Sequence, residues 1–145
     1  MKYLVLVSHG DFAEGLKTSL AMFAGDKIDQ VIAVGLKNGT SADDFAVTFK
    51  EALSGLKDDD SLVLLADIVG GSPLTTALSV LSEMGYLETT TVLGGMNLPM
   101  ALTAIVMKDV LEGDAFVSSV LSEAKTALQE YKTASDDADD EEDDI

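Results

Sequence analysis

The chain contains a single histidine, His9, and no cysteine. His9 follows an apolar segment, residues 3–7, and directly precedes Gly10. Such a segment is typical of a buried parallel strand, and open α/β sheets bind their ligands at the carboxyl ends of the strands. An imidazole with no second histidine or thiolate to share a metal favours nucleophilic or base chemistry over metal binding. The alternative is a histidine that only satisfies a backbone carbonyl at the strand end.

Two further loops place small and polar residues at predicted strand ends. Asp67 follows the apolar segment 62–66, and Gly94-Gly95 closes a later strand before Asn97-Leu-Pro-Met100. Parallel strands bring these loops to one edge of the sheet, where Asp67 can accept a hydrogen bond from Nδ1–H of His9. That bond would fix the tautomer, leave Nε2 facing solvent and stabilise a positive charge on the ring. The alternative is that Asp67 is a solvated acid at the end of its strand.

The segment Gly70-Gly71-Ser72-Pro73 lies just after Asp67 and predicts the start of a helix. Ser72 is expected as the N-cap, with Pro73 in the first helical position. Glycines allow a ligand to approach the backbone closely, and a helix N-terminus offers free N–H groups and a positive dipole end. The hydroxyls of Ser72 and Thr75 add donors. A tight turn followed by a capped helix would explain the same residues without a ligand.

Strand and helix patterns alternate along the chain. We expect strands over 3–7, 30–34, 62–66 and 89–93, and helices over 11–24, 41–53 and 72–84, from Asn97 onward, and over 114–131. This β-α repeat predicts an α/β fold: a doubly wound, mainly parallel sheet of four strands, with a fifth edge strand left open, and helices on both faces.

Composition narrows the function classes. The chain has 145 residues and a formal net charge of −17, and eight of its acids lie in residues 136–145. We therefore predict one domain over 1–132 and an acidic, disordered tail over 133–145. The charge disfavours nucleic acid and anionic membranes and favours a partner with a basic face. Without a membrane span or signal core, a cytoplasmic location is expected.

All nine basic residues are lysines, so the chain cannot form a bidentate guanidinium clamp. A phosphoryl group held here would rest on backbone N–H groups, hydroxyls and helix N-termini.

Three motifs together resemble a known family: His9-Gly with Ala13-Glu-Gly15, Asp67-x-x-Gly-Gly-Ser-Pro73, and Gly95-x-Asn97-x-Pro99-Met100. Over residues 1–132 they resemble the enzyme IIA domain of the mannose-type sugar phosphotransferase system, which includes mannose, fructose and sorbose systems. Each motif is weakly specific alone, but the three in this order are strongly specific.

The resemblance implies a phosphotransferase whose His9 accepts a phosphoryl group from the phosphocarrier HPr and passes it to a IIB protein. The IIB protein acts with the membrane subunits IIC and IID in sugar uptake. The resemblance also implies Asp67 as the partner of the imidazole, Ser72 as a phosphoryl contact, and a homodimer. We add Gly10, Gly71 and Thr75 as predicted phosphoryl contacts. Because the transferred group is already activated and no Walker-type motif is visible, no metal or cofactor is expected.

Two features depart from the family pattern. Thr75 stands where the family commonly has asparagine, so an amide contact is lost while a hydroxyl remains. In some members a C-terminal strand crosses to the dimer partner, whereas residues 125–131 here have a helical pattern.

Three other functions are consistent with part of this pattern. One is the phosphotransfer subunit of a dihydroxyacetone kinase, against which the Gly-Gly-Ser-Pro and Asn-Leu-Pro-Met motifs argue. A second is a regulatory module in which histidine phosphorylation only signals. A third is a serine hydrolase using Ser72, His9 and Asp67, but the second glycine of a nucleophile elbow is missing after Ser72. Which sugar is transported is not readable from this chain.

Overall fold

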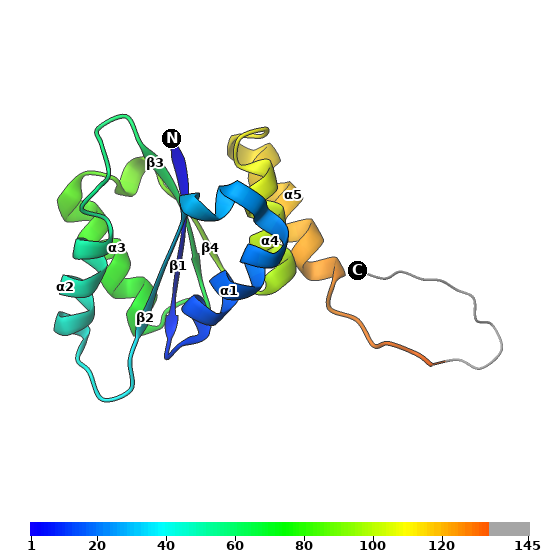
Figure 1. Cartoon of the computed structure of the whole chain (residues 1–145), viewed down its shortest axis with the longest axis horizontal. Helices are drawn as coiled ribbons and strands as arrows, with labels where there is room; N and C mark the ends of the chain where they lie inside the picture. Colours follow the sequence, from blue (N-terminus) through cyan, green and yellow to red (C-terminus); the bar gives the residue numbers. More distant parts are fainter. Residues whose placement is uncertain (134–145) are drawn as a thin grey trace.

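The computed structural model describes residues 1–133, and its centre is one sheet of four parallel strands in the order β2-β1-β3-β4 (Figure 1). The strands are β1 (Lys2–His9), β2 (Val31–Leu36), β3 (Ser61–Ala66) and β4 (Thr91–Gly94). The predicted α/β sheet of four parallel strands is therefore confirmed. The predicted acidic tail, apart from its first residue, lies outside the described residues.

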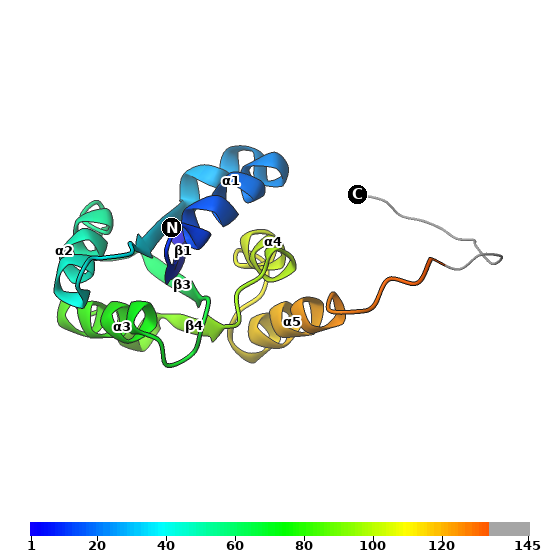
Figure 2. The same cartoon turned by 90° about the horizontal axis from the view of Figure 1, so that it is seen from below.

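Helices cover both faces of the sheet, as expected of a doubly wound fold (Figure 2). One face carries α1 (Phe12–Ala24), α4 (Leu98–Met107) and α5 (Gly113–Thr126), and the other carries α2 (Ala42–Ala52) and α3 (Ser72–Met84). Two short 3-10 helices, η1 (Gly25–Gln30) and η2 (Leu87–Thr89), precede β2 and β4. No helix within residues 1–133 has the length and apolar character that crossing a bilayer requires.

The strands are apolar on both sides because each side packs on helices. In β1, Leu4 and Leu6 belong to the core under α1, α4 and α5, while Val5 and Val7 belong to the core under α2 and α3. All four are fully buried. The continuous apolar segments in the sequence therefore correspond to strands covered on both faces.

The strand order reverses at β1: β2 lies on one side of β1, and β3 and β4 lie on the other. The chain passes from β1 outward to β2 and then returns across β1 to β3. Val7 pairs with Ala66, so the ends of these two central strands are adjacent. This is the topological switch point of the sheet, where open α/β folds bind their ligands.

The helices expected from Ser41 and from Asn97 each begin with a side-chain cap. The Ser41 hydroxyl accepts a hydrogen bond from the Asp44 N–H at 3.1 Å, and the Asn97 side chain accepts one from the Met100 N–H at 2.8 Å. These bonds satisfy N–H groups that have no partner inside the helix.

Two predicted helix boundaries are wrong. The N-cap of α3 is Gly71 rather than Ser72, which is the first helical residue, with Pro73 after it. The Gly71 backbone is extended and its carbonyl accepts the Thr75 N–H at 3.0 Å, so the chain enters the helix one residue earlier than side-chain preferences predict. Helix α5 ends at Thr126 instead of Tyr131, because its buried face ends at Ala124 and Tyr131 is exposed.

Candidate active site

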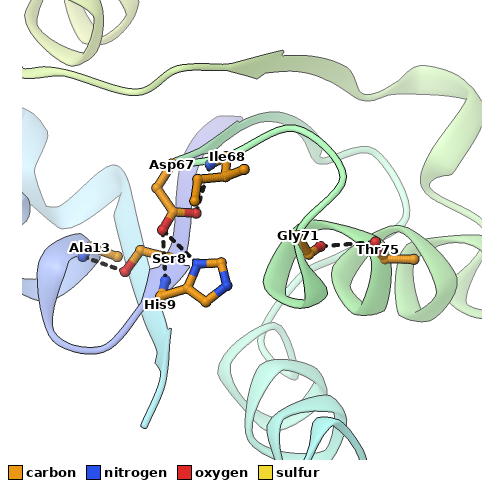
Figure 3. Close-up of polar contacts among 7 residues, drawn as sticks. All are labelled: Ser8, His9, Ala13, Asp67, Ile68, Gly71 and Thr75. Atoms are coloured by element: carbon orange, nitrogen blue, oxygen red, sulfur yellow. Dashed lines mark hydrogen bonds and ion pairs between the residues drawn. The ribbon is translucent and has the colours of Figure 1, made fainter. Parts of the chain in front are cut away.

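The structure brings His9 and Asp67 together at the switch point (Figure 3). One carboxylate oxygen of Asp67 accepts hydrogen bonds from the His9 backbone N–H at 2.9 Å and from Nδ1 of its ring at 2.8 Å. The other oxygen accepts the Ile68 N–H at 2.8 Å. Because an ionised carboxylate has no proton to donate, Nδ1 carries a hydrogen, and in the neutral ring Nε2 then presents its lone pair. The position of both residues at adjacent strand ends is as predicted.

Electrostatics keep Asp67 ionised. Burial, the largest single effect, raises the pKa of its carboxyl group. The hydrogen bonds from the His9 backbone, the His9 ring and the Ile68 backbone, with the charge of His9, outweigh burial and lower that pKa below its ordinary value. The carboxylate is therefore charged at neutral pH and serves as a fixed acceptor for the ring.

The imidazole lies between Asp67 and the first turn of α3 (Figure 3). A Cβ added at Gly71 would lie 2.8 Å from Cε1 and 3.4 Å from Nε2 of His9. Only a residue without a side chain lets the helix N-terminus approach the ring this closely. The His9 side chain is 47% exposed, so the ring remains accessible while its Nδ1 side is fixed.

The first turn of α3 supplies donors at this position. The intrahelical bonds begin with the Thr75 N–H, so the N–H groups of Ser72 and Leu74 precede them, and Pro73 has none. The positive end of the helix dipole lies at the same place. The helix N-terminus beside the ring is therefore suited to an anion.

Two of the predicted phosphoryl contacts have other partners in the structure. The Thr75 hydroxyl donates to the Gly71 carbonyl at 2.9 Å, inside the first helical turn. The Gly10 N–H donates to the Leu36 carbonyl at 2.7 Å, and the positive φ of Gly10 turns the chain out of β1. A serine–histidine–aspartate triad also has the bond from Nδ1 to the aspartate, so the distinguishing contact is at Nε2. Within residues 1–133, no hydrogen bond joins the Ser72 hydroxyl to His9. A serine–histidine nucleophile pair is therefore not formed.

A residue that the sequence interpretation missed is Ser8. Its side chain is fully buried, and its hydroxyl accepts the Ala13 N–H at 2.7 Å in the first turn of α1. Asp11, which occupies the N-cap position, makes no side-chain cap bond. Ser8 therefore ties the helix after His9 to the end of its own strand. The signal that could have revealed it is a hydroxyl in an otherwise apolar strand.

Lys37 was missed as well. It directly follows β2 and forms ion pairs with Asp11, at 2.7 Å, and with Glu14 at the start of α1. The hydrogen bonds that its ammonium group donates to Asp11, the larger effect, and to Glu14 raise its pKa above the ordinary value. These pairs are exposed and salt-screened, so they add little stability, but they join the loops after β1 and β2.

Fold and site together define a class: an α/β protein with one carboxylate-bonded imidazole at the switch point of a parallel sheet and a helix N-terminus at its free nitrogen. The family described as the PTS system fructose IIA component (EIIA-man) matches residues 3–121. The chain belongs to this family, the mannose-family EIIA components of the sugar phosphotransferase system.

Relatives and solved structures agree with this assignment. The chain is 27% identical over 141 residues to the fructose-specific EIIA component of Bacillus subtilis (strain 168), covering 92% of this chain and 94% of the relative. It is similar to the EIIA crystal structure from Streptococcus agalactiae, with a TM-score of 0.74, 26% identity, and coverage of 90% and 97% of the two chains.

Another similar structure is the mannose/sorbose specific IIA subunit from Enterococcus faecalis, with a TM-score of 0.67 and 27% identity. It covers 93% of this chain and 98% of that chain. As an EIIA component, the chain is a phosphotransferase component of sugar transport.

Proposed function

We propose that His9 is the residue that carries the phosphoryl group, accepting it on Nε2 from phospho-HPr and passing it to a IIB protein. The observation that carries this proposal is the bond from Nδ1 to Asp67, which leaves Nε2 as the accessible nucleophile. The IIB protein would act with the membrane subunits IIC and IID, which this chain serves indirectly. We propose a homodimer in the cytoplasm as the working form, on the family resemblance alone.

The forward step is an in-line displacement at phosphorus. The Nε2 lone pair of neutral His9 forms a bond to phosphorus, and the bond between phosphorus and the imidazole nitrogen of HPr breaks, returning its electron pair to the HPr ring. His9 then holds phosphorus on Nε2 and hydrogen on Nδ1, with a positive charge shared by the ring. The Asp67 carboxylate, 2.8 Å from Nδ1, stabilises this charge. Transfer to IIB runs the same step in reverse with a new acceptor.

The phosphoryl oxygens would meet the first turn of α3. The backbone N–H groups of Ser72 and Leu74 are the donors that the geometry favours, with the Ser72 hydroxyl beside them. The absence of a side chain at Gly71 gives the phosphoryl group access to this turn. Thr75 and Gly10 would support the turn and the loop, since their donors already have partners.

The sugar does not follow from the relatives. Similar proteins are described as fructose-specific, as mannose/sorbose specific and as associated with a fucose utilization operon. Since these descriptions name different sugars at similar identity, no one sugar carries over to this chain.

The test is phosphorylation by purified enzyme I, HPr and phosphoenolpyruvate. We expect one phosphate per chain that is labile in acid and stable in base, and no phosphate in His9→Ala. Because the chain has one histidine, an acid-labile phosphohistidine can only be at His9. Phosphate that persists in His9→Ala, or that appears on serine, would refute the proposal. Transfer onward to a IIB protein, and not to dihydroxyacetone kinase subunits, separates the two relay functions; transfer to neither would favour the regulatory module.

A further inference from the structure

Two glycines lie near the carboxyl ends of the edge strands, Gly35 as the residue before the last of β2 and Gly94 as the last of β4. Gly35 of β2 pairs with Ser8, the residue before His9, and Gly94 of β4 pairs with Ala66, the residue before Asp67. Neither glycine is among the described residues with positive φ, so the backbone conformation alone does not require glycine at either position. Another reason for the missing side chains must lie in what surrounds them.

The reason is the path of the neighbouring loops. A Cβ at Gly35 would lie far inside 3.0 Å of the Gly10 carbonyl oxygen, and a Cβ at Gly94 would lie far inside 3.0 Å of Cγ2 of Val69. Real Cβ atoms essentially never approach other atoms so closely. The loop after β1 therefore crosses the end of β2 only because Gly35 has no side chain, and the Val69 side chain of the loop after β3 lies over the end of β4 only because Gly94 has none.

Both loops hold groups of the site. The first begins at Gly10, directly after His9, and the Gly10 N–H donates to the Leu36 carbonyl of β2. The second contains Asp67, the Ile68 N–H that binds its carboxylate, and Gly71, where a Cβ would collide with the imidazole. A shift of about an ångström in either loop would change the geometry between the ring, the carboxylate and the helix N-terminus.

We infer that Gly35 and Gly94 are positioning residues for phosphoryl transfer, which leave the space that the loops after β1 and β3 need to bring His9, Asp67 and Gly71 together. This inference rests on the proposed function of His9. Neither glycine touches the reacting atoms; each acts through the loop that crosses it.

The two clashes differ in a way that gives a direct test. At Gly94 the nearest atom is the end of a side chain, and the next nearest atoms, Cβ and N of Val69, are at 3.5 and 3.7 Å, which is ordinary contact. Val69→Ala removes Cγ2 and therefore makes room for a methyl group at position 94. At Gly35 the nearest atom is a backbone carbonyl, which no side-chain substitution removes.

The experiment measures single-turnover phosphorylation by phospho-HPr over a range of HPr concentrations. Misplacement by about 1 Å can cost about 10²-fold in rate, so we expect losses of that order in the maximal rate for Gly94→Ala and Gly35→Ala. In the double variant V69A/G94A the methyl group at position 94 has room, so we expect its maximal transfer rate to lie within about threefold of that of Val69→Ala alone. The same Val69→Ala change should leave the defect of Gly35→Ala in place. Gly55→Ala is the matched control, because a Cβ there meets nothing within 4 Å.

A second readout does not depend on HPr. Nitrogen-15 NMR of the single imidazole reports which ring nitrogen carries the hydrogen, and we expect the share of the Nδ1–H form to fall in Gly94→Ala and Gly35→Ala and to recover in V69A/G94A. Thermal unfolding establishes that each variant is folded. If Gly94→Ala does not fold, the test is made with Gly35→Ala.

A wild-type rate and tautomer in the folded glycine variants would overturn the inference, as would a double variant as slow as Gly94→Ala. If the wild-type chain is not phosphorylated at all, the proposed function fails, and the tautomer measurement still decides whether the glycines position the ring.

Discussion

Replacement of Asp67 by asparagine tests the central pair. Asp67 accepts three hydrogen bonds, two from His9 and one from the Ile68 N–H. An asparagine side chain has one acceptor oxygen and one donor NH₂ group. Whichever way the amide is turned, its NH₂ group faces an N–H group, either that of Ile68 or those of His9. The substitution therefore removes the charge and disturbs the tautomer with almost no change of volume.

The size of the effect follows from the exposure of the pair. Opposite charges about 4 Å apart attract by about 1 kcal/mol in bulk water and by about 4 kcal/mol at an effective dielectric constant of 20. The His9 side chain is 47% exposed and that of Asp67 is 12% exposed, so the pair lies between these limits. About 2–3 kcal/mol of stabilisation of the charged phosphorylated ring corresponds to a loss of roughly 10²-fold in transfer rate.

The assay is rapid-quench transfer from phospho-HPr to the EIIA component and back. Asp11→Asn is the matched control, since Asp11 lies two residues after His9, is 86% exposed and pairs with Lys37 instead of with the ring. We expect the control to transfer within about twofold of the wild type, because exposed ion pairs contribute little. Equal rates in Asp67→Asn and Asp11→Asn, in both directions, would refute a role for Asp67 in orienting or stabilising the ring.

We also expect the stability difference between the wild type and Asp67→Asn to depend on pH. The folded state lowers the pKa of Asp67 from its ordinary value of 3.8, so ionisation of Asp67 adds stability above that value. This contribution is lost as the pH falls through the lowered pKa. The difference in the free energy of unfolding between the wild type and Asp67→Asn should therefore shrink in acid below pH 3.8. A difference that is constant with pH would contradict the assigned cause of the shift.

Two further predictions concern the support of the site and the acidic C-terminal residues. Ser8→Ala removes the acceptor for the buried Ala13 N–H, and we expect chemical denaturation to show that the free energy of unfolding falls by about 1–2 kcal/mol. Thr18→Ala, on the exposed side of α1, is the control. An equal loss in both variants would contradict the capping role of Ser8. Removal of residues 136–145 changes the net charge from −17 to −9. We expect the fold to persist and the association rate with a basic partner to fall at low salt only, as stopped-flow binding over a salt series would show; an equal loss at all salt concentrations would contradict this.

The fold was predictable because its strands are short, apolar and separated by clear helix signals. The alternation of Leu4, Val5, Leu6 and Val7 fills two cores, and that is why a continuous apolar segment indicated helices on both faces. The end of α5 was not predictable from local pattern. Residues 125–131 continue a helical spacing, but the helix needs a surface to pack on, and residues 1–133 offer it none beyond Ala124.

The site was predictable only as far as strand ends define it. His9 and Asp67 follow adjacent strand ends, so the switch point brings their backbones close together, and the loops then set the geometry between the two side chains. The partners of Gly10 and Thr75, and the buried hydroxyl of Ser8, depend on where the chain goes after each strand. The space at Gly35 and Gly94 depends on loops that come from a different strand each time. Such contacts between distant segments leave no periodic pattern in the sequence.

The geometry of the site explains how a chain without arginine could hold a phosphoryl group. On the proposed function, the phosphoryl group is held by its covalent bond to Nε2, so the non-covalent contacts need only orient it. Backbone N–H groups at the start of α3 are weaker than a guanidinium fork and release the oxygens more easily. The strong interactions of the site, those made by Asp67, bind the imidazole and not the phosphoryl group. A relay benefits from this division because tight binding of the transferred group would slow its departure to the next acceptor.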